Sequence, residues 1–415
     1  MIPTPRFAYT LIGVAAVLVA LGTVVGVVAL AVVVAGYVVD VMRLRRGPEM
    51  ERLVPVKLQR LHPALLEITT RDPRASRTLV RQPSVPDLHL DEQTGEDHLS
   101  TSIVATRRGR HTLPRAALRS VGPLGLAVRH HELGEPHGIT VYPDVIGAKR
   151  IARAVATGTF SAVGWRRKGP VGIGTEFETI RDYTPDDDIR HVNWRATLRT
   201  GKPMTNVYRV DRDRDVICVI DSGRLMTAPA GVHTRLDVAV DAAAAIAYSA
   251  DALGDRCGVV AFTDRVVRSM PPTRRGARAA VEAIHDLEPQ AVQSNYDMAF
   301  RALGRSKRAL VVLFTDLFEE TAAMPLVEAL PALSRHHAVI VAYVRDDDLR
   351  AAVTSPGDGD EGAYRAVVAL DALAARRAAT ARLRHRGITV IEAPADTLPT
   401  AAVGAYLDLK QRAVV

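Results

Sequence analysis

The hydrophobic pattern begins with a long uncharged run. From Phe7 to Val39 no charged residue occurs, and Val, Ala, Leu and Gly dominate. A single helix of that length would extend about 50 Å, whereas the hydrocarbon core of a bilayer is about 30 Å thick. A cleaved signal peptide fits poorly, because its apolar region is only about 7–15 residues long. We therefore predict a transmembrane segment over residues 1–46, either one strongly tilted helix or, as we favour, a helical hairpin turning near residues 22–26.

The basic residues beside this run predict its orientation. Arg43, Arg45 and Arg46 follow the run, whereas Arg6 alone precedes it. By the positive-inside rule, the chain after the run lies on the cytoplasmic side of the cell membrane. A hairpin would bring the N-terminus inside as well, and a single span would leave it outside. In both cases the remaining domains are expected to be cytosolic and tethered to the lipid bilayer.

The pattern after the apolar run is typical of β-structure. Short β-prone pieces, such as residues 53–58 and 102–106, are separated by proline and glycine. This spacing predicts a small antiparallel β-sandwich over residues 47–148. No cluster of titratable residues stands out there, so we expect a structural or protein-binding role. Residues 149–206 then form a connector.

From residue 207 to 415 the pattern changes to an alternation of apolar strands and amphipathic helices. Strands are predicted at 216–221, 257–262, 309–316, 338–344 and 388–392, and helices at 236–253, 277–287, 324–333, 365–386 and 397–411. Continuous apolar strands separated by helices indicate a parallel sheet covered on both faces, which is the α/β class.

Two carboxylates follow strands of this predicted sheet. Asp221 and Asp316 both stand at carboxyl ends of strands, where open α/β sheets bind ligands. With a hydroxyl from Ser222 or Ser294 they would form an oxygen cradle suited to magnesium or calcium. The alternative is that Asp221 caps the next helical turn while Asp316 accepts hydrogen bonds from loop amides.

The composition narrows the classes of function. The net charge is +8 and the pI is about 9.7, but acidic residues are interleaved with the basic ones and no basic run carries aromatic residues. We therefore expect no nucleic-acid binding. The two cysteines, Cys218 and Cys257, are too few for a zinc cluster and lie in apolar runs, which predicts buried, reduced thiols.

A longer motif carries a family resemblance. Residues 174–194 contain Glu-Phe, Arg-Asp-Tyr, Pro-Asp-Asp-Asp, Arg and Asn-Trp in order, and Val141-Tyr142-Pro143 and Ala309–Leu317 add to the pattern. Together they resemble the domain-of-unknown-function 58 family over nearly the whole chain. The resemblance implies a von Willebrand factor A-like (Rossmann-type) domain over residues 207–415. It also implies association with a MoxR-type AAA+ ATPase in protein assembly or maturation.

The family's adhesion-type metal motif is Asp-x-Ser-x-Ser with a later Thr and Asp. Asp221 matches its first carboxylate, Ser294 stands where the Thr would be, and Asp316 matches the last Asp. Gly223 and Leu225 replace both serines of the first loop. The resemblance therefore implies a degenerate magnesium site formed by Asp221, Ser294 and Asp316, with two oxygen donors missing.

The connector holds a second set of candidate residues, namely Arg181, Asp187, Arg190 and Trp194. Trp and Arg are the residues that anchor protein contacts, so the set is a possible docking surface. Alternatively, Arg–Asp pairs form within the connector and Trp194 is buried between domains. We favour this internal role, because interspersed Asp and Arg commonly pair within a chain.

These observations together predict a membrane-tethered cytosolic scaffold or adaptor that is not an enzyme. The chain lacks a nucleophile elbow, a zinc-protease motif, paired cysteines and a P-loop. Two alternatives stay open. One is a metal-dependent hydrolase using Asp221 and Asp316, and the other is a cell-envelope factor related to polysaccharide.

Overall fold

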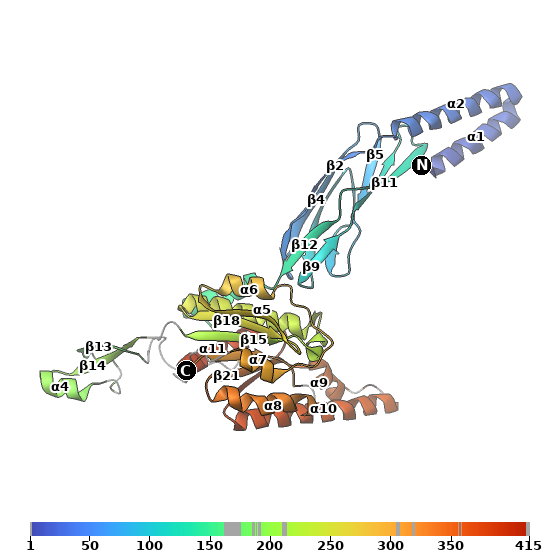
Figure 1. Ribbon diagram of the computed structural model, residues 1–415. Helices are drawn as coiled ribbons and strands as arrows, with labels where there is room; N and C mark the ends of the chain where they lie inside the picture. Colours follow the sequence, from blue (N-terminus) through green and yellow to red (C-terminus); the bar gives the residue numbers. More distant parts are fainter. Residues whose placement is uncertain are drawn as a thin grey trace. The chain divides into compact units, whose positions relative to one another are not determined.

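In the computed structural model of the chain, the residues described are 2–161, 176–184, 187, 189, 192–209, 214–303, 308–317, 320–355, 357 and 359–411. The chain divides into two units, residues 1–142 and 143–415 (Figure 1). Each unit is described by itself below.

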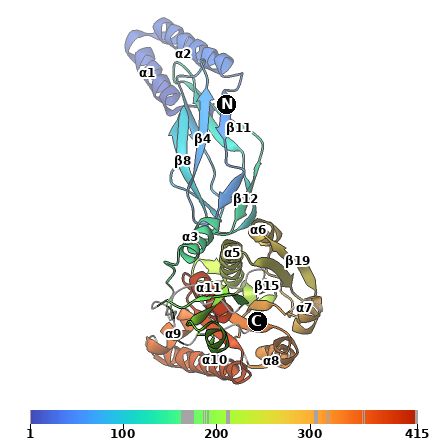
Figure 2. The same ribbon diagram turned by 90° about the vertical axis from the view of Figure 1, so that its left-hand side faces the viewer.

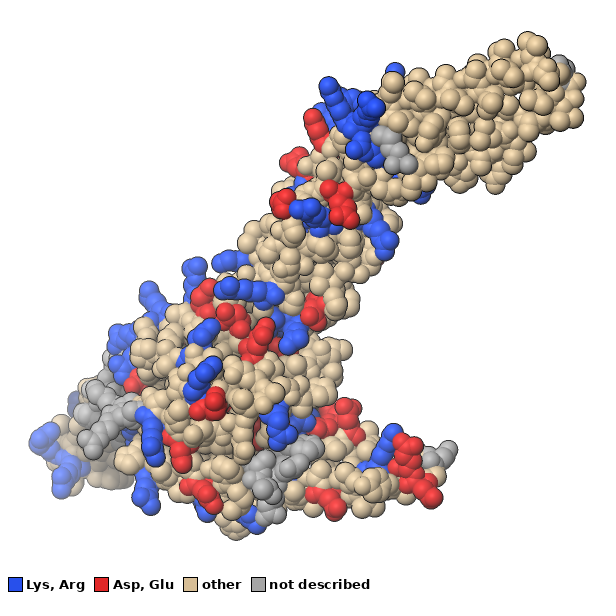
Figure 3. Space-filling view, turned by 45° about the vertical axis from the view of Figure 1, so that its right-hand side comes forward, with Lys and Arg blue, Asp and Glu red and all other residues tan. Residues whose placement is uncertain are grey.

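The first unit begins with two apolar helices, α1 (Pro5–Leu21) and α2 (Thr23–Arg43), which meet at Gly22. Gly22 has φ +91°, a conformation that glycine adopts without strain. The helices pack closely at Gly26, where an added Cβ would lie only 2.6 Å from the Cβ of Leu18. Their outer surface carries almost no charge (Figure 3). Helix α2 is long and apolar enough to cross a membrane, whereas α1 is shorter.

Asp40 fixes the end of α2 to the β-structure of the same unit. Its buried carboxylate accepts hydrogen bonds from the backbone N–H groups of Leu124 (3.0 Å), Leu126 (2.8 Å) and Ala127 (3.3 Å). A Cβ on Gly122 would lie 2.3 Å from the Cγ of Asp40, so the turn has no room for a side chain there. The Asp40 carboxylate therefore joins the end of α2 to this turn, and Thr4 before α1 bonds to the same turn through Gly125 O (2.6 Å).

We predict that Asp40→Ala loosens this turn. Three amides lose their acceptor, so hydrogen exchange of the peptide covering residues 122–127 should become about tenfold faster or more. The measurement is hydrogen–deuterium exchange of the full-length protein in detergent, followed by mass spectrometry. Thr10→Ala, at an exposed position on α1, serves as the control and should leave exchange unchanged. Equal exchange in wild type and Asp40→Ala would contradict this assignment.

Two sheets of the first unit face each other across one core. The nine-stranded sheet has the order β1-β11-β10-β5-β7-β8-β4-β2, with β6 paired to β8, and the three-stranded sheet has the order β3-β12-β9. Leu66 and Ile103 of the larger sheet share a core with Leu58 and Val141 of the smaller. The strands are β1 (Ile2–Pro3), β2 (Glu49–Leu53), β3 (Lys57–Gln59), β4 (Ala64–Arg71), β5 (Arg77–Arg81), β6 (Leu88–Leu90), β7 (Thr94–Glu96), β8 (His98–Ala105), β9 (Gly109–Leu113), β10 (Ala116–Val121), β11 (Ala127–Leu133) and β12 (His137–Tyr142).

The second unit contains a six-stranded sheet, and its mixed helix and strand content confirms the α/β prediction. The order is β19 (Val266–Arg274), β18 (Arg256–Phe262), β15 (Asp215–Asp221), β20 (Leu310–Phe314), β21 (Ala338–Val344) and β22 (Thr389–Ala393). Neighbouring strands are parallel except β19, which runs antiparallel to β18 at the edge. In chain order this arrangement is 3-2-1-4-5-6, that of doubly wound sheets.

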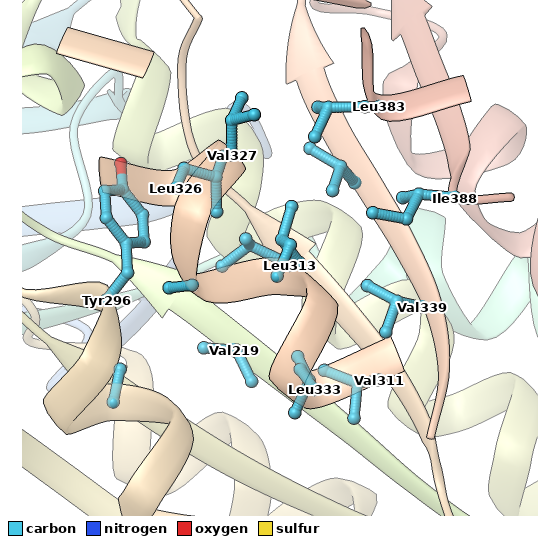
Figure 4. Close-up of a cluster of buried hydrophobic side chains, with 14 of the residues drawn as sticks. Val219, Tyr296, Val311, Leu313, Leu326, Val327, Leu333, Val339, Leu383 and Ile388 are labelled. Carbon is cyan, nitrogen blue, oxygen red and sulfur yellow. The ribbon is translucent and has the colours of Figure 1, made fainter. Parts of the chain in front are cut away.

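Helices cover both faces of this sheet (Figures 1 and 2). The helices α5 (Arg235–Leu253) and α11 (Leu398–Gln411) pack together on one face, and α3 (Val145–Ala156) packs on α5. On the other face, side chains of α7 (Tyr296–Ala302), α8 (Glu320–Ser334) and α10 (Gly359–His385) close a core over the strands (Figure 4). Val219, Leu313 and Val341 are fully buried in it, because their strands have helices on both sides.

The remaining elements of the second unit are short. Three short elements connect strands of the sheet along the chain: α6 (Ala277–Ile284), α9 (Asp347–Thr354) and the 3₁₀ turn η2 (Arg224–Thr227). In addition, β16 (Pro229–Ala230) pairs with β17 (His233–Thr234). The segment predicted as a connector, with the residues just after it, contains an antiparallel strand pair, β13 (Glu176–Asp182) and β14 (Met204–Arg209). Helix α4 (Trp194–Thr200) lies between these two strands in sequence.

Candidate functional site

Asp221 ends the strand at which the sheet changes direction. The chain crosses from β15 to β18 on one side and reaches β20 on the other, so β15 and β20 flank the topological switch point. One oxygen of Asp221 accepts hydrogen bonds from Gly223 N–H (2.8 Å) and the Ser294 hydroxyl (2.5 Å). Its other oxygen accepts from the hydroxyls of Thr315 (2.7 Å) and Tyr296 (3.1 Å). Four donors therefore surround a carboxylate that is 1% exposed.

Burial controls the titration of this group. Removal from water raises the pKa of Asp221 above its ordinary value, and the four hydrogen bonds oppose that shift without cancelling it. The pKa of the Tyr296 hydroxyl is raised well above its ordinary value by burial and by the adjacent Asp221 charge. Tyr296 therefore stays protonated and donates to Asp221.

Asp316 meets two arginines from distant helices. Arg235 forms an ion pair with it from α5, and the Nη2 of Arg376 on α10 lies 3.0 Å from its Oδ1. Asp346 completes the group, because the same two arginines also pair with its Oδ2, at 2.5 and 3.8 Å. Two guanidinium groups thus balance two carboxylates. We call Arg235, Asp316, Asp346 and Arg376 the arginine–aspartate quartet.

Local structure positions the quartet. Thr234 and Asp237 form a capping box at the start of α5, which places Arg235 in its first turn. Asp346 caps α9 by accepting from Leu349 N–H. Burial and the neighbouring Arg376 charge lower the pKa of Arg235 to about 10, so it remains charged at neutral pH. Sequence reasoning found Asp316 but missed Arg235, Asp346 and Arg376, although the arginines within the alanine-rich stretch 372–381 are a recognisable signal.

The residues at the carboxyl ends of β15 and β20 do not fit a bound magnesium ion. Asp316 is held by two arginines and by Leu317 N–H, and all the donors around Asp221 point protons at it. A Cβ on Gly223 would lie 2.1 Å from the Ser294 Oγ, so Ser294 fills the space where a side chain of residue 223 would stand. Ser222 donates away from the site, to Phe262 O at 2.9 Å. Among the described residues no three His, Cys, Asp or Glu side chains gather as a metal set.

The connector residues lie in a separate cluster. Both Nη atoms of Arg181 bind the carboxylate of Asp187, at 2.8 and 2.6 Å, and Thr184 donates to it from its N–H and its hydroxyl. Trp194 begins α4 and is 65% exposed. Arg190 lies outside the described residues. Arg181 and Asp187 thus pair within the connector, while Trp194 is open to solvent.

This pairing predicts a low titration point for Asp187. Hydrogen bonds from Arg181 and Thr184 lower its pKa from 3.8 to about 2. A depressed folded-state pKa means that the stabilisation is complete above the ordinary value and is lost as pH falls from about 3.8 towards about 2. Carbon-13 NMR of aspartate-labelled full-length protein should show this carboxyl titrating near 2, and Arg181→Gln should move it back up. A wild-type titration at the ordinary value would contradict the pairing.

Comparison with known proteins gives a similarity to one family and no assigned activity. Residues 179–385, just under half of the chain, match the family described as "Protein of unknown function DUF58". The chain is 26% identical over 182 residues to "Uncharacterized protein Mb1516" of Mycobacterium bovis and to "Uncharacterized protein Rv1480" of Mycobacterium tuberculosis. The alignment covers 42% of this chain and 56% of each relative, so the chain spans little more than half the length of these curated relatives. The matched range contains Asp221, Ser294 and the whole quartet, and the candidate site therefore lies in the part of the chain that is similar to the DUF58 family.

Proposed function

We propose that this protein is a membrane-tethered scaffold whose second unit is a von Willebrand factor A-like docking domain. Its partner is a MoxR-type AAA+ ATPase acting in protein assembly or maturation. The partner is proposed from the family resemblance. The sheet order 3-2-1-4-5-6 with an antiparallel edge strand supports the Rossmann-type assignment of the domain.

The membrane attachment is proposed from α1 and α2. Exposed valines cover α2, including Val24, Val28 and Val32, and such an apolar surface favours lipid over water. The three arginines after α2 outnumber the single Arg6 before α1, which supports a cytoplasmic location for both units.

One observation carries the docking role: side chains and backbone N–H groups of the protein itself already satisfy the carboxylates at the switch point. Asp221 and the quartet hold the strand ends in place. A partner protein would therefore contact the residues around these carboxylates. Beside Ser294 lies a cavity of about 450 Å³ with three exposed acids in its lining, Asp264, Asp297 and Glu328. We call these three residues the acidic rim. A partner that docks here would present a basic surface.

The test uses purified components. Full-length protein in nanodiscs is titrated with the MoxR-type ATPase of the same organism, loaded with a non-hydrolysable ATP analogue. Saturable binding is expected, and Asp264→Asn/Asp297→Asn/Glu328→Gln should weaken it about tenfold or more, chiefly by slowing association. The matched control, Asp348→Asn/Asp360→Asn/Asp371→Asn, removes three exposed acids outside the rim and should bind like wild type. Absence of binding, or equal weakening in both variants, would overturn the proposal.

A further inference from the structure

A second cavity in the α/β unit has four arginines among its twelve described lining residues. It has a volume of about 690 Å³ and is lined by residues of α9, α10, the edge strand β22 and the neighbouring strand β21. This volume is in the range of small-molecule sites, about 300–1,000 Å³. Helix α10 contributes Leu373, Arg377, Ala381 and Arg384, which recur at spacings of three and four residues and so form one stripe along the helix.

The charges in this cavity are not balanced within the described residues. Arg350 is paired with Glu392 at 3.4 Å, and Arg376 is committed to Asp316 and Asp346 of the quartet. Arg377 has no acidic partner in the described part of the chain, and Arg384 donates to the neutral backbone oxygen of Val390 at 3.3 Å. Glu392 is the one acid among the described lining residues. Two guanidinium charges are therefore left without a counter-charge.

The uncharged part of the lining adds two kinds of contact. The hydroxyls of Thr354 and Thr380 are further hydrogen-bonding groups beside the arginines, and Thr380 already shares a hydrogen bond with Tyr343 (2.9 Å). Val353, Leu373 and Ala381 supply apolar wall. A ligand that matches this lining carries about two negative charges at one end and an apolar or neutral portion at the other.

We propose that this cavity binds a small phosphate monoester. Its phosphoryl group carries about −1.5 to −2 charges at pH 7, which matches the two unbalanced arginines, and the planar guanidinium fork suits bidentate binding of phosphate oxygens. The site is separate from the acidic rim, so it concerns a ligand of the α/β unit and does not depend on the proposed ATPase partner.

The test is isothermal titration of the full-length protein in an uncharged detergent, at constant ionic strength in phosphate-free buffer. Inorganic phosphate and glycerol 1-phosphate are the two probes. Binding of both would identify the phosphoryl group as sufficient, and binding of the ester alone would show that the organic portion is needed. In either case Arg377→Gln/Arg384→Gln should lower the affinity about tenfold or more.

The control variant, Arg301→Gln/Arg365→Gln, removes two exposed arginines outside the cavity and should keep wild-type affinity. Because Arg377 and Arg384 are themselves exposed, the variant should unfold at the wild-type temperature, which is measured alongside. The proposal would be overturned if neither probe bound saturably, or if wild type and the cavity variant had equal affinity.

Discussion

Asp316→Ala should destabilise the α/β unit by about 3–5 kcal/mol, because it leaves two buried arginines facing one carboxylate. Arg235 and Arg376 are 4% and 3% exposed, so water cannot replace the lost charge. Hydrogen exchange of the β20 amides in the full-length protein measures this loss. An effect below about 1 kcal/mol would contradict the quartet.

The charge balance itself is tested by a second substitution. Arg376→Met in the Asp316→Ala background restores one positive group against one negative group. The double variant should therefore lose less stability than the sum of the single variants, by about 1–3 kcal/mol. Asp316→Ala combined with Arg365→Gln is the matched control and should be additive, because Arg365 is an exposed residue that pairs with Glu361. Additivity in both combinations would show that Asp316 and Arg376 are not coupled.

Asp221→Ala should have a comparable effect, about 3–5 kcal/mol, because it leaves the Gly223 N–H and three hydroxyls without their shared acceptor. Asp221→Asn should cost less, since the amide oxygen can accept from Gly223 N–H while the hydroxyls of Thr315 and Tyr296 reorient to accept from its NH₂ group. Hydrogen exchange of the β15 amides compares the two variants. Ser294→Ala, which removes one donor, should cost only about 1 kcal/mol.

The pH dependence of the stability distinguishes the effect of the Asp221 charge from that of its hydrogen bonds. Burial raises the folded-state pKa of Asp221, so the folded state binds its proton more tightly than the unfolded state does. Stability should therefore fall as pH rises from the ordinary value of 3.8 through the raised folded-state value. Asp221→Asn should flatten that part of the profile. An unchanged slope in the variant would mean that another group causes it.

Much of the fold of the α/β unit could be predicted, because apolar runs set its elements directly. The strand predicted at 338–344 is β21, and the helix predicted at 236–253 is α5 with one further residue. The strand β19 was missed, since Val266–Arg274 contains polar residues and Pro271-Pro272, which are unfavourable in a central strand but tolerated at an edge.

The candidate site was predictable only in part. The strand-end rule located Asp221 and Asp316 at one edge of the sheet, and Ser294 does contact Asp221. The partners of Asp316 could not be derived, because Arg376 lies 60 residues away in sequence and no local pattern links the two. The alternative drawn from the sequence has Asp221 capping the next helical turn and Asp316 accepting hydrogen bonds from loop amides. Leu317 N–H does donate to Asp316, whereas Asp221 accepts from Gly223 N–H and the following turn η2 has no side-chain cap.

Added magnesium distinguishes a site completed by arginines from one completed by a metal ion at the carboxyl ends of β15 and β20. The full-length protein is stripped with a chelator, and the unfolding of its α/β unit is followed as MgCl₂ is added, beside KCl at matched ionic strength. If the quartet completes the site, MgCl₂ should cause no saturable rise in the unfolding temperature beyond that caused by KCl. A saturable stabilisation by Mg²⁺ that disappears in Asp221→Asn would contradict the account and restore a metal site at Asp221, Ser294 and Asp316.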